Sequence, residues 1–295
     1  MTGTVVFVHG RGQEFRAPEE LAREWLAGLN AGLTSAGLPA LTPERTVLPF
    51  YGNVLYQAAS RPDAGRPHLE GLPSDPDVPG PLHPYLPADA GEVERRLVAD
   101  MAAALDVDDV AEPELFGWAP DRLLSWDATR RLLLRIADRT RADQEIITAH
   151  LRDVAVYLTR ARDEVLDAVR RAVPESGALV LVTHSLGTVV GRDLLEDPAV
   201  RDRTGTWITV GSPLGLEAVQ RNLRPPGARH PGPGVEWTSA YDVRDIVALG
   251  HPLRPIYGDP LTDVRVLNGD RPHGIERYLA HAEVAGPIGR ALARG

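Results

Sequence analysis

The sequence contains no cysteine and no lysine, and its aromatic content is only 5%. Without cysteine the chain forms no disulfide, no thiolate metal site and no cysteine nucleophile. All 32 basic residues are arginine, so no lysine is available as a catalytic base or to form a Schiff base. Composition alone therefore excludes several classes of enzyme.

The chain has neither an excess of basic residues nor a long apolar run. Its formal net charge is −9, so we expect no nucleic-acid partner, because binding phosphates requires an excess of positive charge. No stretch approaches the ~20 apolar residues of a membrane span, so we expect no integral membrane association. The first apolar run, Thr4–Val8, is too short for the core of a signal peptide and follows no basic leader. We expect a cytoplasmic protein.

Short β-branched runs alternate with helical patterns over most of the chain. The expected strands are Thr4–Val8, Thr46–Tyr51, Ala178–Thr183, Thr206–Val210, Val235–Tyr241 and Val264–Leu267. The expected helices are Pro18–Ala36, Asp143–Val173, Gly187–Glu196 and Ile275–Ala293. This alternation predicts an α/β fold, with a mainly parallel sheet of about six or more strands and helices on both faces. We expect residues 1–295 to form a single domain.

One segment, residues 52–141, interrupts the alternation. Residues 60–87 are rich in Pro and Gly and indicate a long loop, whereas 92–105 and 121–139 show helical patterns. An insertion without core strands is typically a lid or binding loop. We therefore predict that this segment is a cap, and that Phe116, Trp118 and Trp126 within it bind substrate. The alternative is that these rings anchor the cap helices to the core.

The most informative pattern is a strand that leads directly into a serine and then a helix. The run Ala178–Thr183 precedes Ser185, and Gly187 follows it. A serine hydroxyl becomes a useful nucleophile when a sharp strand-to-helix turn exposes it beside a base, and small residues two positions away make room for that turn. Thr183 occupies the position two residues before the serine, where glycine is more common. The alternative is a serine that only caps the helix.

A nucleophilic serine requires backbone donors for the oxyanion that forms when it attacks a carbonyl. The amide of Leu186, directly after Ser185, is the first expected donor. The second is expected in the glycine-rich turn that follows the first strand, and we assign it to the amide of Arg11. The alternative is a purely structural turn.

The catalytic base is expected after the serine, with an acid between them in the chain. Four histidines follow the nucleophile turn: His230, His251, His273 and His281. We predict that His273 is the base, because it lies between the last expected strand and the last expected helix.

Two carboxylates, Asp242 and Asp245, follow the strand expected at Val235–Tyr241. Both lie where sites gather in open α/β sheets, at the carboxyl end of a strand. We favour Asp245 as the residue that holds the histidine, because the apolar pair after it can bury it. Either aspartate could instead stabilise the turn that ends the strand.

Taken together, these segments resemble the bacterial α/β-hydrolase superfamily, in its serine esterase and lipase branch. The segment Phe7–Gly12 is similar to the oxyanion segment of small lipases, and Thr183–Gly187 to the nucleophile elbow. Gly211–Leu214 resembles the stretch after the next strand. Asp245 begins a segment similar to the lipase acid motif, although Ala248 replaces the usual proline. His273, followed by Tyr278, resembles the terminal histidine segment.

The sequence therefore predicts a serine hydrolase that cleaves a carboxylic ester or thioester of a small acyl substrate. Neither a metal nor an organic cofactor is expected, because the histidines lack the spacing of metal ligands. Two alternatives stay open: an acyltransferase or cyclising enzyme with the same catalytic residues, and a non-catalytic binding member of the fold. Acyl chain length, leaving group and oligomeric state are not encoded in recognisable patterns.

Overall fold

The chain folds around a six-stranded sheet in which every pairing is parallel. The computed structural model describes residues 3–60, 91–106, 132, 133, 135–137, 139 and 144–294. The strand order is β2-β1-β3-β4-β5-β6. The strands are β1 (Thr4–Val8), β2 (Thr46–Val47), β3 (Leu179–His184), β4 (Thr204–Val210), β5 (Glu236–Tyr241) and β6 (Leu261–Arg265). The prediction of an α/β fold with a parallel sheet is confirmed.

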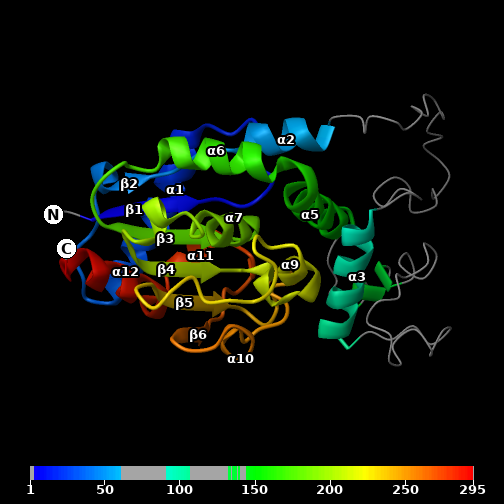
Figure 1. Ribbon diagram of the computed structural model, residues 1–295. Coiled ribbons are helices and arrows are strands. Elements are labelled where there is room, and N and C mark those ends of the chain that lie inside the picture. The colour runs from blue at the N-terminus through cyan, green and yellow to red at the C-terminus, as the bar shows by residue number, and fades with distance from the viewer. Residues whose placement is uncertain are drawn as a thin grey trace.

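Helices cover both faces of this sheet (Figure 1). One face is covered by α1 (Pro18–Ser35), α11 (Ile275–Leu279) and α12 (Ala282–Arg294). The other is covered mainly by α2 (Gly52–Ser60), α6 (Arg162–Ala172) and α7 (Leu186–Leu194). Further helical segments are η1 (Pro43–Arg45), α3 (Glu92–Ala104), α5 (Gln144–Val156), the π-helical η2 (Tyr157–Ala161), α8 (Pro198–Arg201), η3 (Pro213–Gly215), α9 (Glu217–Arg221) and α10 (Arg254–Tyr257).

Successive residues of the central strands belong to different cores. In β1, Val6 and Val8 face the layer of α6 and α7, whereas Val5 and Phe7 face α1 and α12. Side chains alternate across a strand, so a strand buried on both faces is apolar at every position. This explains why the central strands are continuous runs of Val, Leu and Ile.

Helices α3, α5 and α9 lie beyond the carboxyl ends of the strands, while both chain ends lie at the other end of the sheet (Figure 1). Helix α3 packs against α5 and α9. Polar side chains that follow parallel strands gather at that carboxyl edge. The fold therefore places the nucleophile turn under helices that the chain inserts between β2 and β3.

Two predicted strands are wrong in extent, and both lie at the edges of the sheet. The strand expected over Thr46–Tyr51 ends at Val47, because Pro49 follows and the chain turns inward to bury Tyr51. The strand expected over Val264–Leu267 begins earlier, at Leu261, and ends at Arg265, leaving Leu267 66% exposed. Edge strands are covered on fewer sides, so their apolar pattern is a weaker guide.

Two predicted helices are divided. The expected helix over Asp143–Val173 runs as α5, η2 and α6, with a π-helical insertion in the middle. The expected helix over Ile275–Ala293 breaks between α11 and α12, at Ala280 and His281. The break lets both pieces pack on α1, where Gly32 lies against the backbone of Leu279.

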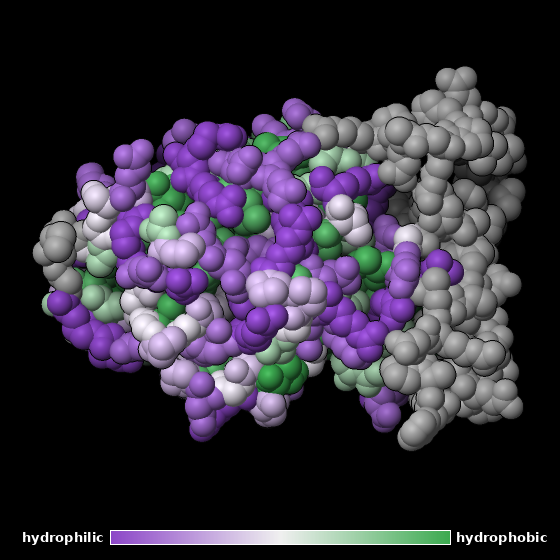
Figure 2. All heavy atoms as spheres, in the orientation of Figure 1, coloured by the Kyte–Doolittle hydropathy of each residue, from purple (hydrophilic) through white to green (hydrophobic). Residues whose placement is uncertain are grey.

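One face of the described part of the chain is mostly polar (Figure 2). On the face shown in Figure 2, hydrophilic residues predominate and hydrophobic ones show as separate spots among them. Within the same described ranges, no helix is both long enough and apolar enough to cross a membrane.

Candidate active site

Ser185 occupies a tight turn between β3 and α7. Its backbone has φ 57° and ψ −131°, a conformation that non-glycine residues adopt at an energetic cost. The Ser185 N–H donates to the Val210 carbonyl at 3.1 Å, which ties the turn to β4. The side chain is 1% exposed, and its Oγ makes no hydrogen bond within the described residues. The strained turn thus holds a hydroxyl with no structural partner.

Two glycines make this turn possible. A Cβ on Gly187 would overlap the carbonyl oxygens of Val8 and His9, which are backbone atoms that cannot rotate away. A Cβ on Gly10 would lie 2.8 Å from the Ser185 Cβ. The turn after β1 is therefore packed directly against the serine and against the first turn of α7.

Thr183 replaces the glycine commonly found two residues before such a serine, and its surroundings accommodate it. Its hydroxyl donates to the Ile208 carbonyl at 3.1 Å and accepts from the Trp207 indole N–H at 3.0 Å. The space for its methyl group comes from Gly191, where a Cβ would lie 2.7 Å from Thr183 Cγ2. The β-branched residue is satisfied here, so it does not argue against the turn.

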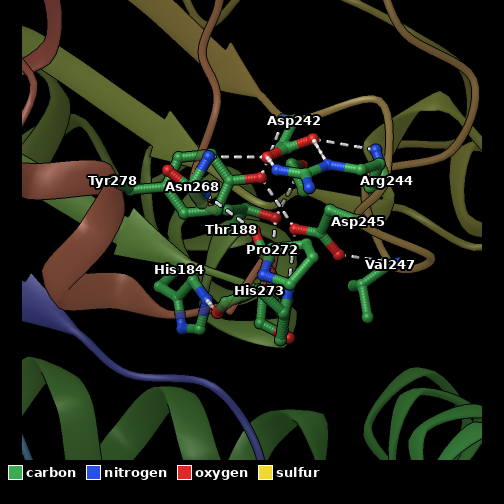
Figure 3. A network of polar contacts seen from close by, with 12 residues as sticks. His184, Thr188, Asp242, Arg244, Asp245, Val247, Asn268, Pro272, His273 and Tyr278 are labelled. Atoms are coloured by element: carbon green, nitrogen blue, oxygen red, sulfur yellow. Dashed lines mark hydrogen bonds and ion pairs between the residues drawn. The ribbon is translucent and has the colours of Figure 1, made fainter. Parts of the chain in front are cut away.

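His273 lies on the loop that precedes α11, and Asp245 holds its ring. The Nδ1–H of His273 donates to Asp245 Oδ2 at 2.8 Å (Figure 3). The imidazole is about one-third exposed, while the carboxylate is fully buried. A carboxylate in this position fixes the tautomer with a free Nε2, which can accept a proton. The structure therefore brings together the two residues predicted as base and acid.

Asp245 is buried but stays ionised because its neighbours donate to it. Burial alone opposes the charge, but the charge of His273 and three hydrogen bonds outweigh burial and lower the pKa of Asp245. Besides His273, the Tyr278 hydroxyl donates to Oδ2 at 2.7 Å and the Val247 N–H to Oδ1 at 2.9 Å. Tyr278 in turn accepts the Asp242 N–H at 3.0 Å.

Asp242 lies close by but has a different task. Its carboxylate accepts the backbone N–H groups of Arg244 and Asn268, at 2.9 and 2.7 Å, and pairs with the Arg244 side chain. Figure 3 shows it directed toward these two residues, while Asp245 faces His273. The geometry thus distinguishes the two aspartates that the sequence left open: Asp242 closes the turn after β5, and Asp245 contacts the histidine.

The other histidines near the sheet have structural partners. His230 packs against Trp237, and His251 stacks on Tyr241. His281 contacts Asn268 through its Nε2 at 3.1 Å. Of the candidates for the base, His273 alone contacts a carboxylate at hydrogen-bond distance within the described chain.

His9 is fixed as a neutral ring. It stacks on Tyr51, its Nδ1–H donates to the Gly10 carbonyl and its Nε2 accepts the Tyr51 N–H. Burial lowers its pKa to about 4.

His184, next to the serine in sequence, supports the His273 loop. Its Nε2–H donates to the His273 carbonyl at 3.0 Å, and the two rings lie 4.5 Å apart between centroids. Burial, followed by the charge of His273, lowers the pKa of His184 well below its ordinary value, so the ring is neutral. Sequence reasoning identified this residue only as a neighbour of the nucleophile.

The two residues predicted to supply oxyanion donors flank Ser185. Leu186 begins α7, where backbone N–H groups point out of the helix end. Arg11 follows Gly10, which touches the serine. The Arg11 side chain is bound to helix α5, where its Nε donates to Asp153 Oδ2 at 2.6 Å. This ion pair, which no sequence pattern indicated, joins the turn after β1 to the helices above the site.

Ser185 and His273 open onto the same cavity, of about 560 Å³. Residues from α1, α3, α5, α11, the end of β3 and the loops after β1, β3, β5 and β6 line it. They are His9, Gly10, Arg11, Gln13, Arg16, Leu21, Glu24, Trp25, Met101, Ile147, His150, His184, Ser185, Ile246, Val247, Arg271, His273, Gly274, Ile275 and Glu276. A cavity of this size accommodates a small organic substrate.

Part of the predicted cap contributes to this wall, since Met101 of α3 belongs to residues 52–141. Phe116, Trp118 and Trp126, predicted to bind substrate, lie outside the described residues. His150 on α5 was not singled out from the sequence, because an isolated histidine within a helical pattern carries no signal.

No group of three or more His, Asp or Glu side chains in the described ranges is arranged to hold a metal ion. The chain matches no protein-family model, and no curated protein matches it closely enough to be a relative.

Proposed function

We propose that this protein is a serine hydrolase of the α/β-hydrolase fold that cleaves a carboxylic ester or thioester. One observation carries the proposal. Ser185, with a buried and unpartnered hydroxyl on a strained turn, shares a cavity with His273, whose ring is held by the ionised Asp245. Buried polar atoms without partners are rare, and strained backbone concentrates at functional sites.

The reaction begins when His273 Nε2 takes the proton of the Ser185 hydroxyl. The Oγ attacks the substrate carbonyl, and the amides of Arg11 and Leu186 stabilise the resulting oxyanion. The tetrahedral intermediate collapses, and the protonated His273 gives its proton to the departing alkoxide or thiolate, which leaves as the alcohol or thiol while the acyl group stays on Ser185. Water, deprotonated by His273, then attacks the acyl carbonyl to give a second tetrahedral intermediate. The bond between the acyl carbon and Ser185 Oγ breaks, His273 returns the proton to Oγ, and the acid is released. Throughout, Asp245 stabilises the imidazolium form of His273.

A fluorophosphonate probe tests the proposal directly, because it reacts covalently with activated serines. We expect it to label Ser185, and we expect Ser185→Ala to abolish labelling and to reduce turnover by roughly 10³-fold or more. A panel of p-nitrophenyl esters and thioesters of graded acyl length then defines the substrate.

Ser239→Ala is the matched control. Ser239 is also fully buried with an unpartnered Oγ, but it does not line the cavity. The control should label as the wild type does. Labelling that survives Ser185→Ala, or turnover within about tenfold of the wild type, would falsify the assignment.

A further inference from the structure

His150 is a buried histidine that the proposed reaction does not use. It lies on α5, is 6% exposed and lines the same cavity as Ser185. Its ring meets the ring of His273 edge-on, with 6.5 Å between centroids. Within the described part of the chain, neither of its ring nitrogens makes a hydrogen bond.

An imidazole at this position is not required by the packing of α5. The neighbouring positions Ile147, Leu151 and Val154 are buried apolar residues, and a leucine or phenylalanine would continue the same pattern. A polar ring enclosed without a partner is unfavourable, so such groups are normally paired with protein, water or ligand. The open cavity is the place from which a ligand can supply that partner.

His150 is suited to binding rather than to base catalysis. Burial, together with the charges of His273 and Arg11, lowers its pKa to about 3, so the ring is neutral at working pH. Asp153, on the same helix, is engaged by Arg11. A neutral imidazole carries one N–H donor and one acceptor nitrogen.

The cavity wall combines apolar side chains, among them Met101, Ile147 and Val247, with polar and charged ones. Polar groups placed among apolar ones are the usual means by which a pocket fixes the orientation of a ligand, and His150 supplies one of them from α5. His150, His273 and Ser185 line one cavity, with the His150 and His273 rings edge-on to each other, so an acyl group carried by Ser185 in this cavity comes within the neighbourhood of His150.

We propose that His150 is a specificity-determining residue that binds a hydroxyl or carbonyl oxygen on the acyl chain close to the scissile bond. The preferred substrates are then oxygenated acyl esters or thioesters rather than plain hydrocarbon ones. This inference rests on the proposed hydrolase function and specifies its substrate class.

The experiment compares ethyl butyrate with ethyl 2-hydroxybutyrate and ethyl 3-hydroxybutyrate, with acid release followed by a pH indicator. We expect wild type to prefer at least one hydroxy ester over the plain ester by tenfold or more in kcat/KM, since a site built to bind a hydroxyl rejects the analogue that lacks it. His150→Phe should reduce that ratio to within about twofold of one. His150→Gln, which keeps a donor and an acceptor, should retain part of the preference.

His230→Phe is the matched control, because it makes the same substitution at a histidine outside the cavity. It should keep the wild-type ratio. Melting temperature and fluorophosphonate labelling show whether each variant is folded with an active serine. If the wild type is labelled at Ser185 but wild type and His150→Phe have the same ratio of kcat/KM for hydroxy ester over plain ester, the role of His150 is refuted and the proposed hydrolase function is not. Wild type that is neither labelled at Ser185 nor active would overturn both.

Discussion

The Tyr278 hydroxyl provides a sharp test of the charge network behind the histidine. It donates to Asp245 Oδ2 at 2.7 Å and accepts the Asp242 N–H at 3.0 Å, and the residue is fully buried. Burial, followed by the charge of Asp245, raises the pKa of Tyr278, so the hydroxyl stays protonated and is a permanent donor. Tyr278→Phe removes this donor while keeping the ring.

The expected loss follows from the two bonds. A hydrogen bond to a charged group contributes about 1.5–3 kcal/mol, and leaving the Asp242 N–H unpaired adds to the loss. We therefore expect the free energy of unfolding to fall by about 3 kcal/mol at neutral pH. For a chain of this size, this corresponds to a decrease in melting temperature of roughly 6–12 °C.

The loss should also depend on pH. The folded-state pKa of Asp245 lies below its ordinary value of 3.8, so the ionised form stabilises the fold above that pH, and this contribution disappears as pH falls through the lowered pKa. Removing Tyr278 OH raises the folded pKa of Asp245. The difference in the free energy of unfolding between wild type and Tyr278→Phe should therefore be largest at pH 7, and it should decrease as the pH drops toward and below 3.8.

Urea unfolding across this pH range measures both effects, with Tyr257→Phe as the control. The Tyr257 hydroxyl is also buried, but it donates to a neutral acceptor, the Leu214 carbonyl, at 3.1 Å. Removing the Tyr257 hydroxyl should lower the free energy of unfolding by about 1 kcal/mol at every pH. Equal, pH-independent losses in the two variants would refute the view that Tyr278 stabilises an ionised Asp245.

Two further pairs of substitutions test the site. Asp245→Asn should lower kcat by roughly 10³-fold or more while the protein stays folded. Asp242→Asn should mainly lower the melting temperature, because it weakens the turn after β5. If Asp242→Asn lowers kcat more than Asp245→Asn does, Asp242 is the acid. Gly187→Ala should destabilise the fold by about 1–3 kcal/mol or more and reduce fluorophosphonate labelling, because its Cβ would displace the turn after β1. Gly205→Ala, where a Cβ meets nothing within 4 Å, should leave melting temperature and labelling unchanged; a neutral Gly187→Ala would show that the close packing is dispensable.

The central strands and the nucleophile turn were predictable because their signals are local. Strand β1 has the predicted bounds, and β3 and the helix after Ser185 differ from prediction by a residue or two. The order of Ser185, Asp245 and His273 along the chain also followed from the sequence, and the contact between the last two agrees with it. Apolar periodicity and glycine spacing are properties of short segments, so both can be read directly from the sequence.

Features set by tertiary contacts were not predictable. The break before α12 depends on packing against Gly32 of α1, which is remote in the chain. The choice between Asp242 and Asp245 depends on which carboxylate faces the histidine, and both follow the same strand. The ion pair between Arg11 and Asp153 and the contact of His150 with His273 join residues more than a hundred positions apart. A single sequence carries no record of such pairings.

The position of β1 beside β3 bears on how the chain tolerates changes in length. Thr4 pairs with Leu179, so a very large loop closes before this central pairing forms. An ordinary strand–helix–strand unit needs roughly 30 residues, and closure entropy grows only with the logarithm of loop length. The extra length therefore adds about 1.5 kcal/mol to the entropic free-energy cost of closing the loop. Insertions between β2 and β3 can thus grow or shrink with little effect on equilibrium stability, while folding becomes slower as this contact becomes more remote. The wall above the nucleophile can diversify in length without loss of the sheet beneath it.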